Sequence, residues 1–316
     1  MKNNNVLVTG GCGFIGANLI PRLEALGYKI NVLDNLSKGS LDYIKNTNAR
    51  IFVGDIRDRK IVTEALAGVS SVIHLAAYGS VVESVNDPVE NFDINVIGTF
   101  TLLDECRKSH IEKIIFSSTG GALMGNTLPP VDEDSVPKPI SPYGSSKLCC
   151  EAYCSSFSHS YGIDITALRF ANVVGPISWH KRGAVTAFMK SILNGENITI
   201  YGNGKATRDF LYVDDLCQGI INTLQTTLPG FQSIHLASGK EVSVSELVNL
   251  ICRIAHSEEH PITYFDKRVG EVERNFADYG LAKELINFHP KTNLNEAISL
   301  TWDWFRKYNS RPSLDN

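Results

Sequence analysis

A tyrosine and a lysine four residues apart are the clearest candidates for proton-transfer chemistry in this chain. Ser141 and Pro142, just before them, suit the N-cap and the first position of a helix, which would place Tyr143 and Lys147 on one helix face. A free phenol has a pKa of about 10, but a nearby ammonium favours the phenolate, which can exchange a proton with a substrate hydroxyl. Because this spacing also arises by chance, its meaning depends on the motifs that accompany it.

A glycine-rich turn near the N-terminus is typical of a dinucleotide site. The run from Val6 to Gly16 has the pattern of a strand, a tight turn and the start of a helix. Glycines there let the backbone approach a pyrophosphate, and the helix N-terminus presents free amides and the positive end of its dipole. The expected cofactor contacts in this segment are Gly10, Gly13, Phe14, Ile15 and Gly16.

Acidic residues after the second and third expected strands indicate which dinucleotide binds. Asp34, followed by Asn35, can accept hydrogen bonds from the hydroxyls of the adenine ribose. A 2'-phosphate would meet like charge there, so the sequence favours NAD over NADP. Asp55 and Ile56 are expected to face the adenine. A simple turn role is the alternative for both aspartates.

These motifs need parallel strands whose carboxyl ends meet at one edge of a sheet. Short β-branched runs alternate with stretches of helical periodicity, which is typical of an α/β fold with a doubly wound parallel Rossmann sheet. The expected strands are 6–8, 30–33, 51–53, 72–75, 114–116 and 165–168, and the expected helices include 14–26, 91–106 and 143–157.

The regular alternation of strands and helices ends after Pro176. The sequence therefore predicts an NAD-binding Rossmann domain over residues 1–175, with a return to the sheet at about 210–237. Residues 176–209 and 238–316 are expected to form a smaller, mixed α/β substrate-binding lobe.

The composition argues against several functional classes. The 316 residues are 43% hydrophobic, enough for a substantial core, and the net charge is -4 with scattered basic residues. We expect no nucleic-acid partner and no membrane partner, since neither a basic patch, a signal peptide nor an apolar run of membrane-helix length is present. The seven cysteines lack metal-site spacing, so we expect no metal and reduced thiols in a cytoplasmic protein.

In their order along the chain, the motifs resemble those of the extended short-chain dehydrogenase/reductase family. Besides the glycine turn, Asp34 and the tyrosine–lysine pair, they include the runs 74–77 and 116–119. The resemblance covers essentially the whole chain, and it is strongest to UDP-glucose 4-epimerases and related sugar-nucleotide epimerases. It implies hydride transfer with NAD as cofactor. It also implies cofactor contacts from Tyr143, Lys147 and the segment Leu75, Ala76 and Ala77.

The same resemblance assigns the catalytic hydroxyl and a bracing residue. Thr119 takes the position of the hydroxyl that bonds the substrate oxygen and relays its proton, with Ser118 as the alternative. Asn95 resembles an asparagine that braces the catalytic segment, although a place on a helix surface is equally compatible with the sequence. Glu83 and Ser84 resemble a loop that lines the sugar pocket.

Resemblance also points to the residues that would bind a UDP-sugar substrate. Asn172 matches a residue that contacts the diphosphate, and Tyr201 begins the segment that holds the nucleotide. Arg208 and Arg268 match two phosphate ligands, and guanidinium groups pair well with phosphate oxygens. The run from His180 to Arg182 adds positive charge near the expected cleft, or else lies in a solvated loop.

The residues around the threonine discriminate among related chemistries. Dehydratases of the family carry an Asp-Glu pair after the threonine and decarboxylases a glutamate in that loop, whereas this chain has Gly120 and Gly121. The pattern thus favours an NAD-dependent 4-epimerase. The alternatives are a UDP-glucuronate 4-epimerase, another sugar-nucleotide dehydratase, decarboxylase or reductase, and a non-catalytic NAD-binding sensor. A sensor has no need of a proton relay.

Two positions bear on the choice of sugar. Asn275 lies seven positions after Arg268. In the epimerases that this chain resembles, a tyrosine at that position accompanies plain hexoses and small residues admit N-acetylhexosamines. Met124 replaces the usual tyrosine and is expected to alter the opposite wall of the sugar pocket. The family also implies a homodimer built on the helices at 91–106 and 143–157, with Leu148, Cys149, Ala152 and Phe157 on the outer face of the second helix.

Overall fold

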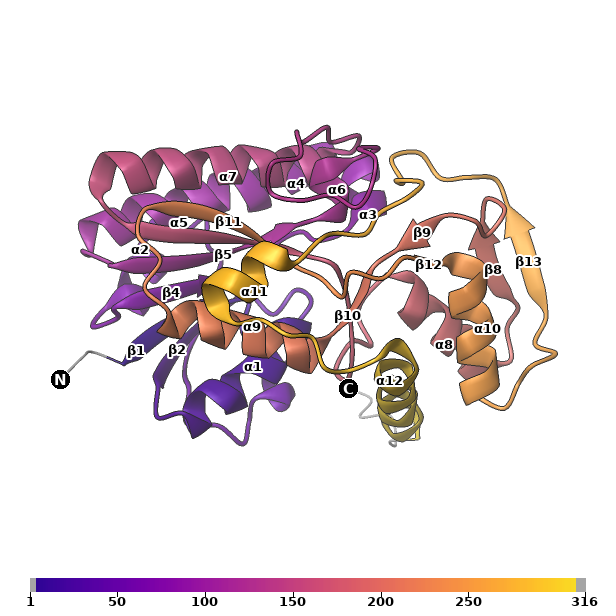
Figure 1. Cartoon of the computed structure of the whole chain (residues 1–316). Helices are drawn as coiled ribbons and strands as arrows, with labels where there is room; N and C mark the ends of the chain where they lie inside the picture. The colour runs from indigo at the N-terminus through magenta and orange to yellow at the C-terminus, as the bar shows by residue number, and fades with distance from the viewer. Residues whose placement is uncertain (1–3, 311–316) are drawn as a thin grey trace.

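The computed structural model describes residues 4–310 and is built around one seven-stranded parallel sheet (Figure 1). The strand order is β11-β6-β5-β4-β1-β2-β3, so the chain winds outward in both directions from β1 and β4. All six expected strands are present in the sheet. Its strands are β1 (Asn5–Thr9), β2 (Lys29–Asp34), β3 (Arg50–Val53), β4 (Ser71–His74), β5 (Lys113–Thr119), β6 (Asp164–Phe170) and β11 (Phe231–Leu236). The α/β prediction is therefore confirmed.

Helices cover both faces of this sheet, as Figure 1 shows. One face carries α1 (Phe14–Ala25), α9 (Val213–Gln225) and α11 (Gly280–Ile286), and the other carries α2 (Arg59–Leu66), α5 (Gly98–Lys108) and α7 (Pro142–Tyr161). Each helical layer buries its own hydrophobic core against the sheet. Pro142 stands at the start of α7 after the N-cap Ser141, whose side chain accepts a hydrogen bond from the Gly144 amide, as the sequence predicts.

Shorter elements lie at the carboxyl edge of the sheet. They are the 3-10 helix η1 (Leu41–Tyr43) and the helices α3 (Val81–Asn86), α4 (Pro88–Phe92) and α6 (Gly121–Met124). The single helix expected over 91–106 is instead divided into α4, the π-helical turn η2 (Asp93–Ile97) and α5. Pro88 starts α4, and the wider π turn occurs where Asn95 is buried under α7.

The smaller lobe lies at the right of Figure 1 and combines helices with short two-stranded sheets. Strand β13 pairs parallel with β8, β12 antiparallel with β9, and β10 parallel with β7. The largest hydrophobic core runs without a break from the sheet into this lobe. The elements of this lobe are α8 (Ala184–Asn194), β8 (Ile198–Tyr201), β9 (Thr207–Arg208), β12 (Val242–Ser243), α10 (Val244–Ile254), β13 (Ile262–Phe265) and α12 (Leu294–Asn309), while β7 (Asn172–Val174) and β10 (Phe210–Tyr212) form a pair between the lobe and the large sheet.

The chain crosses between the two parts more often than the sequence suggests. In the expected return at 210–237, β11 joins the large sheet, but β10 pairs with β7 beside it. Helix α11, expected in the smaller lobe, contacts α9 and β11, because Ala282 and Ile286 are buried in the core on that side. We propose that the Rossmann domain and the smaller lobe are divided at residue 175, and that α11 belongs to the Rossmann domain.

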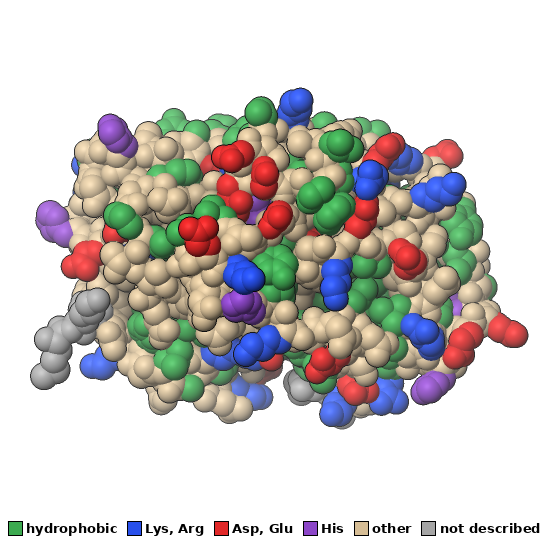
Figure 2. All heavy atoms as spheres, viewed as in Figure 1, with side chains coloured by type: hydrophobic (Ala, Val, Ile, Leu, Met, Phe, Trp, Pro, Cys, Tyr) green, Lys and Arg blue, Asp and Glu red, His purple; other side chains and the backbone are tan. Residues whose placement is uncertain are grey.

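The outer surface in the view of Figure 2 mixes acidic, basic and apolar side chains over the same face. No continuous field of one sign covers that face. Within residues 4–310, no helix combines the length and the apolar character that crossing a membrane requires.

Candidate active site

One cavity of about 920 Å³ follows the carboxyl edge of the large sheet and continues into the smaller lobe. Strand ends and the turns after them line one half, which we call the cofactor half: Gly10, Gly13 to Gly16, Asp34, Asp55 and Leu75 to Ala77. Side chains from the smaller lobe line the other, which we call the substrate half: Asn172, Tyr201, Arg208, Arg268 and Asn275. Thr119, Tyr143 and Lys147 lie on the wall of the same cavity.

The glycine turn leaves backbone where side chains would block the cofactor half. Gly10 has φ of +69°, and a Cβ there would lie 2.6 Å from the Ala76 nitrogen. A Cβ on Gly16 would lie 2.5 Å from the Gly11 Cα, so α1 could not pack this closely against the turn. Gly13 is the N-cap of α1 and provides no side-chain cap, so the first amides of the helix face the cavity free of a side chain. This cradle fits a pyrophosphate.

Asp34 is buried at the end of β2 and bonds to the turn itself. Its carboxylate accepts hydrogen bonds from the amides of Cys12 at 2.9 Å and Leu36 at 2.8 Å. Burial raises the pKa of Asp34, and these two hydrogen bonds oppose the rise. The residue therefore ties β2 to the glycine turn, a contact that the sequence does not reveal, while it also lines the cavity where a ribose would lie.

Asp55 is held mainly by its own turn. Its carboxylate accepts two hydrogen bonds from the Arg57 guanidinium, both at 2.9 Å, and one from Asn35 at 3.2 Å. These contacts, led by the one from Arg57, lower the pKa of Asp55. The geometry fits the turn role more directly than an adenine contact. Ile56, next along the chain, is buried and also lines the cavity.

Thr119 and Tyr143 meet at the junction of the two halves. Thr119 ends β5, Tyr143 is in the first turn of α7, and the threonine hydroxyl bonds to the phenol. Burial raises the pKa of Tyr143 to about 12, while the Thr119 hydrogen bond opposes the rise. The lowered pKa expected from the tyrosine–lysine spacing is thus wrong for the protein alone, because burial outweighs the favourable contacts.

Lys147 lies deeper than its partner. Its ammonium donates a 2.7 Å hydrogen bond to the Ser117 carbonyl and lies 4.7 Å from the centre of the Phe116 ring. Burial lowers the pKa of Lys147 to about 8. A cationic group with few acceptors in a buried site is well suited to bind a ligand hydroxyl.

Neighbouring polar residues hold the start of α7 in place. Ser84 is fully buried and its hydroxyl accepts from the Tyr143 amide at 3.1 Å. Asn95 accepts from the Tyr78 amide at 2.7 Å and donates to the Ser146 hydroxyl at 2.9 Å, so it braces α7 rather than lying on a helix surface. Ser118, the alternative to Thr119, donates to Glu151 at 2.5 Å. Since that bond engages the Ser118 proton, Thr119 is the better placed of the two candidate hydroxyls.

The substrate half contains two arginines in different environments. Arg208 is partly buried, and this burial lowers the pKa of its guanidinium, while the charge of Glu271 opposes the shift. Its Nη1 donates a 2.7 Å hydrogen bond to the Thr207 carbonyl. The Arg268 guanidinium carbon lies 3.5 Å from the centre of the Tyr201 ring, so the two groups stack. The Arg268 side chain is 36% exposed, and its Nη1 lies 3.7 Å from Oε1 of Glu271. An anion bound at Arg208 would compensate a partly buried charge, which makes this arginine the stronger candidate phosphate ligand.

Asn172 also lines the substrate half, from the start of β7, and its amide nitrogen bonds to the Asp209 carbonyl. Its side chain is exposed.

Asn275 and Met124 differ sharply in position. Asn275 lines the cavity although it is only 2% exposed, and its Nδ2 has no hydrogen-bond partner among the described residues. Its Oδ1 lies 3.0 Å from where a Cβ on Gly121 would be, directly beyond Thr119. Met124 does not line the cavity; it is fully buried in a small core with Leu123 and Val131. The expectation that Met124 alters the sugar pocket wall is therefore wrong.

The cations of the run 180–182 are engaged by the protein. Lys181 donates to the Val173 carbonyl at 2.7 Å, and burial lowers its pKa to about 8. Arg182 pairs with Glu83 at 2.9 Å, and Lys38 binds the same carboxylate oxygen at 3.0 Å. Glu83 thus joins three segments around the cavity, a contact that no local sequence pattern indicates.

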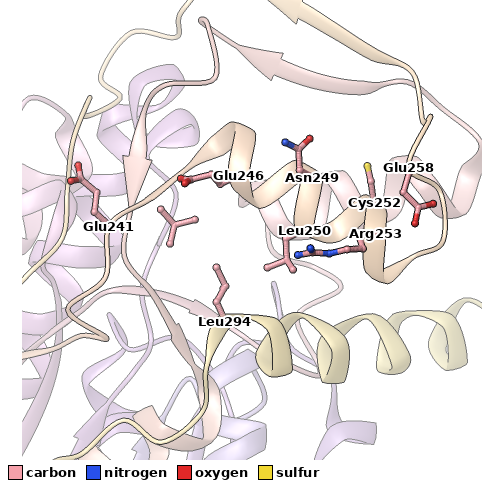
Figure 3. Close-up of a pocket in the computed structure, with 9 residues that line it drawn as sticks. Glu241, Glu246, Asn249, Leu250, Cys252, Arg253, Glu258 and Leu294 are labelled. Carbon is pink, nitrogen blue, oxygen red and sulfur yellow. The ribbon is translucent and has the colours of Figure 1, made fainter.

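A second hollow of about 600 Å³ lies in the smaller lobe, between α10 and the start of α12 (Figure 3). Leu250 and Leu294 line it from the two helices. Two of its acids are committed elsewhere: Glu241 pairs with Arg274, and Glu246 completes the capping box of α10. The first cavity remains the candidate active site.

The model of the NAD-dependent epimerase/dehydratase family matches residues 6–236. The chain belongs to this family. It is 34% identical to the UDP-glucose 4-epimerase of Mycolicibacterium smegmatis over 95% of this chain and 98% of that relative. The confirmed family and the glycine cradle make NAD the cofactor, as predicted.

Two solved structures of the same fold show the range of sugars among such relatives. A Thermotoga maritima UDP-glucose 4-epimerase with UDP-glucose has a TM-score of 0.92 and 36% identity, covering 97% of this chain and all of that one. A Methanobrevibacter ruminantium UDP-N-acetylglucosamine 4-epimerase, in complex with UDP-N-acetylmuramic acid, has a TM-score of 0.90 and 33% identity, covering 98% of this chain and 100% of that one.

Proposed function

We propose that this epimerase-family protein inverts the 4-hydroxyl of a UDP-sugar. The observation that carries the proposal is the Thr119–Tyr143 hydrogen bond at the junction of a single cavity. On one side of that junction the glycine cradle fits a dinucleotide, and on the other Arg208 and Arg268 fit a diphosphate. The similarity to UDP-sugar 4-epimerases over nearly the whole chain supports the same reaction.

In this proposal Tyr143 carries the proton. The positive charge of a bound NAD would favour the deprotonated form of Tyr143 over the phenol of the protein alone. The phenolate oxygen, bonded to Thr119, then accepts the proton of the 4-hydroxyl while the C4–H bond breaks and a 4-keto sugar forms. A bound NAD would supply the hydride acceptor and the hydride donor for carbon 4. After the sugar presents its other face, Tyr143 returns the proton to the 4-oxygen. Protons and electrons balance over the cycle without a second substrate.

Residues beside the threonine favour epimerisation over elimination or decarboxylation. Gly120 and Gly121 follow Thr119, and the space that side chains would fill there is taken by His235 and Asn275. Burial lowers the pKa of His235 to about 3, so this ring is neutral near pH 7. Neither neighbour is a carboxylic acid. A dehydratase needs additional acid and base groups at this place, and an epimerase does not.

Asn275 bears on the sugar. Asparagine leaves room that tyrosine would fill, and its unpartnered Nδ2 can donate a hydrogen bond to an acetamido oxygen. We propose that UDP-N-acetylglucosamine and UDP-N-acetylgalactosamine are substrates together with UDP-glucose and UDP-galactose. A UDP-uronic acid is less well supported, because Lys181 and Arg182, its candidate partners, are held by Val173 and Glu83.

A homodimer is the proposed assembly. Apolar side chains are exposed on α3, α4, η2 and α7, where these helices adjoin: Val85, Val89, Phe92, Ile97 and Tyr153. Phe157, expected on the dimer face, instead packs inside the core against Phe100. Light scattering at micromolar concentration should show a dimer, and a monomer would contradict this assembly.

Cofactor retention and a substrate panel test the proposed reaction. Protein purified without added NAD should release about one NAD per chain on denaturation, since an epimerase regains its oxidised cofactor each cycle. It should also equilibrate the UDP-glucose and UDP-N-acetylglucosamine pairs with no added cofactor. A strict need for added NADPH would point to a net reductase, and bound NAD without turnover on the whole panel would point to a sensor.

A further inference from the structure

A polar row crosses the sheet directly below the catalytic residues. Ser118 in β5 is the register partner of Arg169 in β6, and Arg169 is the partner of His235 in β11. Residues in register on adjacent parallel strands point to the same face of a sheet. All three side chains are buried, one position before the level of Thr119.

Glu151 of α7 lies on this row. It accepts hydrogen bonds from the Ser118 hydroxyl at 2.5 Å and from Arg169, whose Nε and Nη2 lie 3.1 and 2.8 Å from its two oxygens. The side chains of Glu151 and Arg169 are only 6% and 7% exposed. In Figure 1 α7 runs along this face of the sheet, and it contacts β5, β6 and β11. The Glu151 carboxylate thus joins α7 to β6 through an ion pair and to β5 through a hydrogen bond.

Stability alone does not account for this pair. Removing two charges from water costs several kcal/mol per ion, and well-packed apolar residues of similar volume are often as stable or more stable. The arrangement is also incompletely satisfied: Arg169 Nη1 and both ring nitrogens of His235 have no hydrogen-bond partner among the described residues. A directional, bidentate contact does, however, define one position of a helix on a sheet, which apolar packing defines less sharply.

Three consecutive residues of β5 contact three residues of α7. The Ser117 carbonyl accepts from Lys147, Ser118 donates to Glu151, and Thr119 bonds to Tyr143. Tyr143, Lys147 and Glu151 are spaced by four and therefore share one face of the helix. The Glu151 contact is the middle one of the three along β5.

We propose that Glu151 and Arg169 are positioning residues that hold α7 at one place on the sheet. In that position Tyr143 contacts Thr119, and the Lys147 ammonium lies at the cofactor half of the cavity. Neither of the two positioning residues lines the cavity, so they act through Tyr143 and Lys147 and not on the substrate. The effect on turnover rests on the proposed epimerase function, whereas the effect on the position of α7 does not.

Glu151→Gln tests the proposal, with Glu105→Gln as the matched control. Glutamine keeps the volume but replaces one acceptor oxygen by a donor that faces Ser118 or Arg169. Misplacing a catalytic group by about 1 Å can cost about 100-fold, so we expect kcat to fall about 10- to 100-fold with KM and bound NAD little changed. Glu105 is also buried, at 9% side-chain exposure, and pairs with Arg59 and Lys108 away from the cavity. Its variant should keep the wild-type kcat.

A double variant separates positioning from stability. Glu151→Leu/Arg169→Met replaces both charges by apolar groups and should recover much of the thermal stability lost by the single variant. The proposal requires kcat to stay low in this double variant. Recovery of kcat together with Tm would overturn it, as would a Glu151→Gln enzyme with the kcat of Glu105→Gln. If the double variant does not fold, Ser118→Ala removes one of the clamping hydrogen bonds, and wild-type kcat in that variant would overturn the proposal.

Hydrogen exchange provides a readout that needs no substrate. Amides in 143–151 should exchange faster in Glu151→Gln than in Glu105→Gln, because the helix has lost its fixed position on β5. Equal protection in the two variants would overturn the positioning role. A wild-type protein that turns over no UDP-sugar, but shows this difference in exchange, would instead count against the proposed function alone.

Discussion

The cofactor half and the substrate half of the cavity are built in different ways. The cofactor half is mostly backbone: glycines, helix amides and the ends of adjacent strands, all carried by one parallel sheet. The substrate half is mostly side chains from separate segments, including Asn172, Arg208 and Asn275. A backbone site depends on the fold and tolerates little change, whereas a side-chain site can change its ligand by single substitutions. We therefore expect single substitutions to change the sugar more readily than the cofactor.

The largest expected effect lies at the junction of the two halves. Tyr143→Phe removes the proton acceptor and almost no volume, so turnover should fall about 10²- to 10⁴-fold. NAD content should stay at the wild-type level, because the glycine cradle is untouched. Steady-state rates and NAD release on denaturation measure both effects.

Tyr161→Phe is the matched control for that variant. It makes the same change at the far end of α7, where Tyr161 is 52% exposed, and should keep wild-type activity. A Tyr143→Phe enzyme that kept more than about a tenth of the wild-type rate would contradict the assigned general base.

Lys147→Ala should disturb the cofactor half as well as the chemistry. The variant loses a buried ammonium that can bind a ligand hydroxyl, and a charged hydrogen bond contributes about 1.5–3 kcal/mol. We expect NAD affinity to weaken by about 10- to 100-fold and turnover to fall with it. Dialysis followed by NAD assay checks this. Lys190→Ala, which removes an ammonium 4.5 Å from the Trp179 ring outside the cavity, is the control.

Arg208→Gln should affect the substrate half and leave the cofactor half intact. Loss of a partly buried guanidinium should raise KM for UDP-sugars by about 10- to 100-fold. Arg268→Gln should raise KM less, since Arg268 is more exposed and already stacks on Tyr201. The control is Arg274→Gln, whose arginine pairs with Glu241. If Arg208→Gln lost bound NAD to the same extent as it lost affinity for UDP-sugars, the cofactor half and the substrate half would not bind their ligands independently.

The smallest and most selective effect is expected at the sugar. Asn275→Tyr fills the space beside Gly121 and should lower kcat/KM for the N-acetylated sugars by about 10-fold relative to the plain hexoses. The ratio of the two kcat/KM values is the measurement, and Asn249→Tyr on α10 is the control. Equal losses on both classes of sugar, or wild-type activity confined to UDP-glucuronate, would rule out Asn275 as the determinant.

The local sequence pattern was sufficient to predict the main-chain structure of the cofactor half. The glycine turn, the strand before it and α1 lie within one short segment, so tight turn, helix N-terminus and strand end are all visible in consecutive residues. The spacing of Tyr143 and Lys147 likewise predicts their shared helix face, because α-helical geometry relates residues four apart. Family motifs in their order then predicted the fold and the cofactor.

Tertiary structure alone decided what surrounds these residues. Burial reversed the expected direction of the Tyr143 pKa, and packing against Leu123 and Val131 took Met124 out of the sugar pocket. Glu151 meets Ser118 only because α7 lies across β5. Sequence periodicity specifies which side of an element is apolar, but burial, desolvation and long-range hydrogen bonds depend on which distant segment packs there. Those interactions set pKa values, positions and specificity, and they exist only in the folded chain.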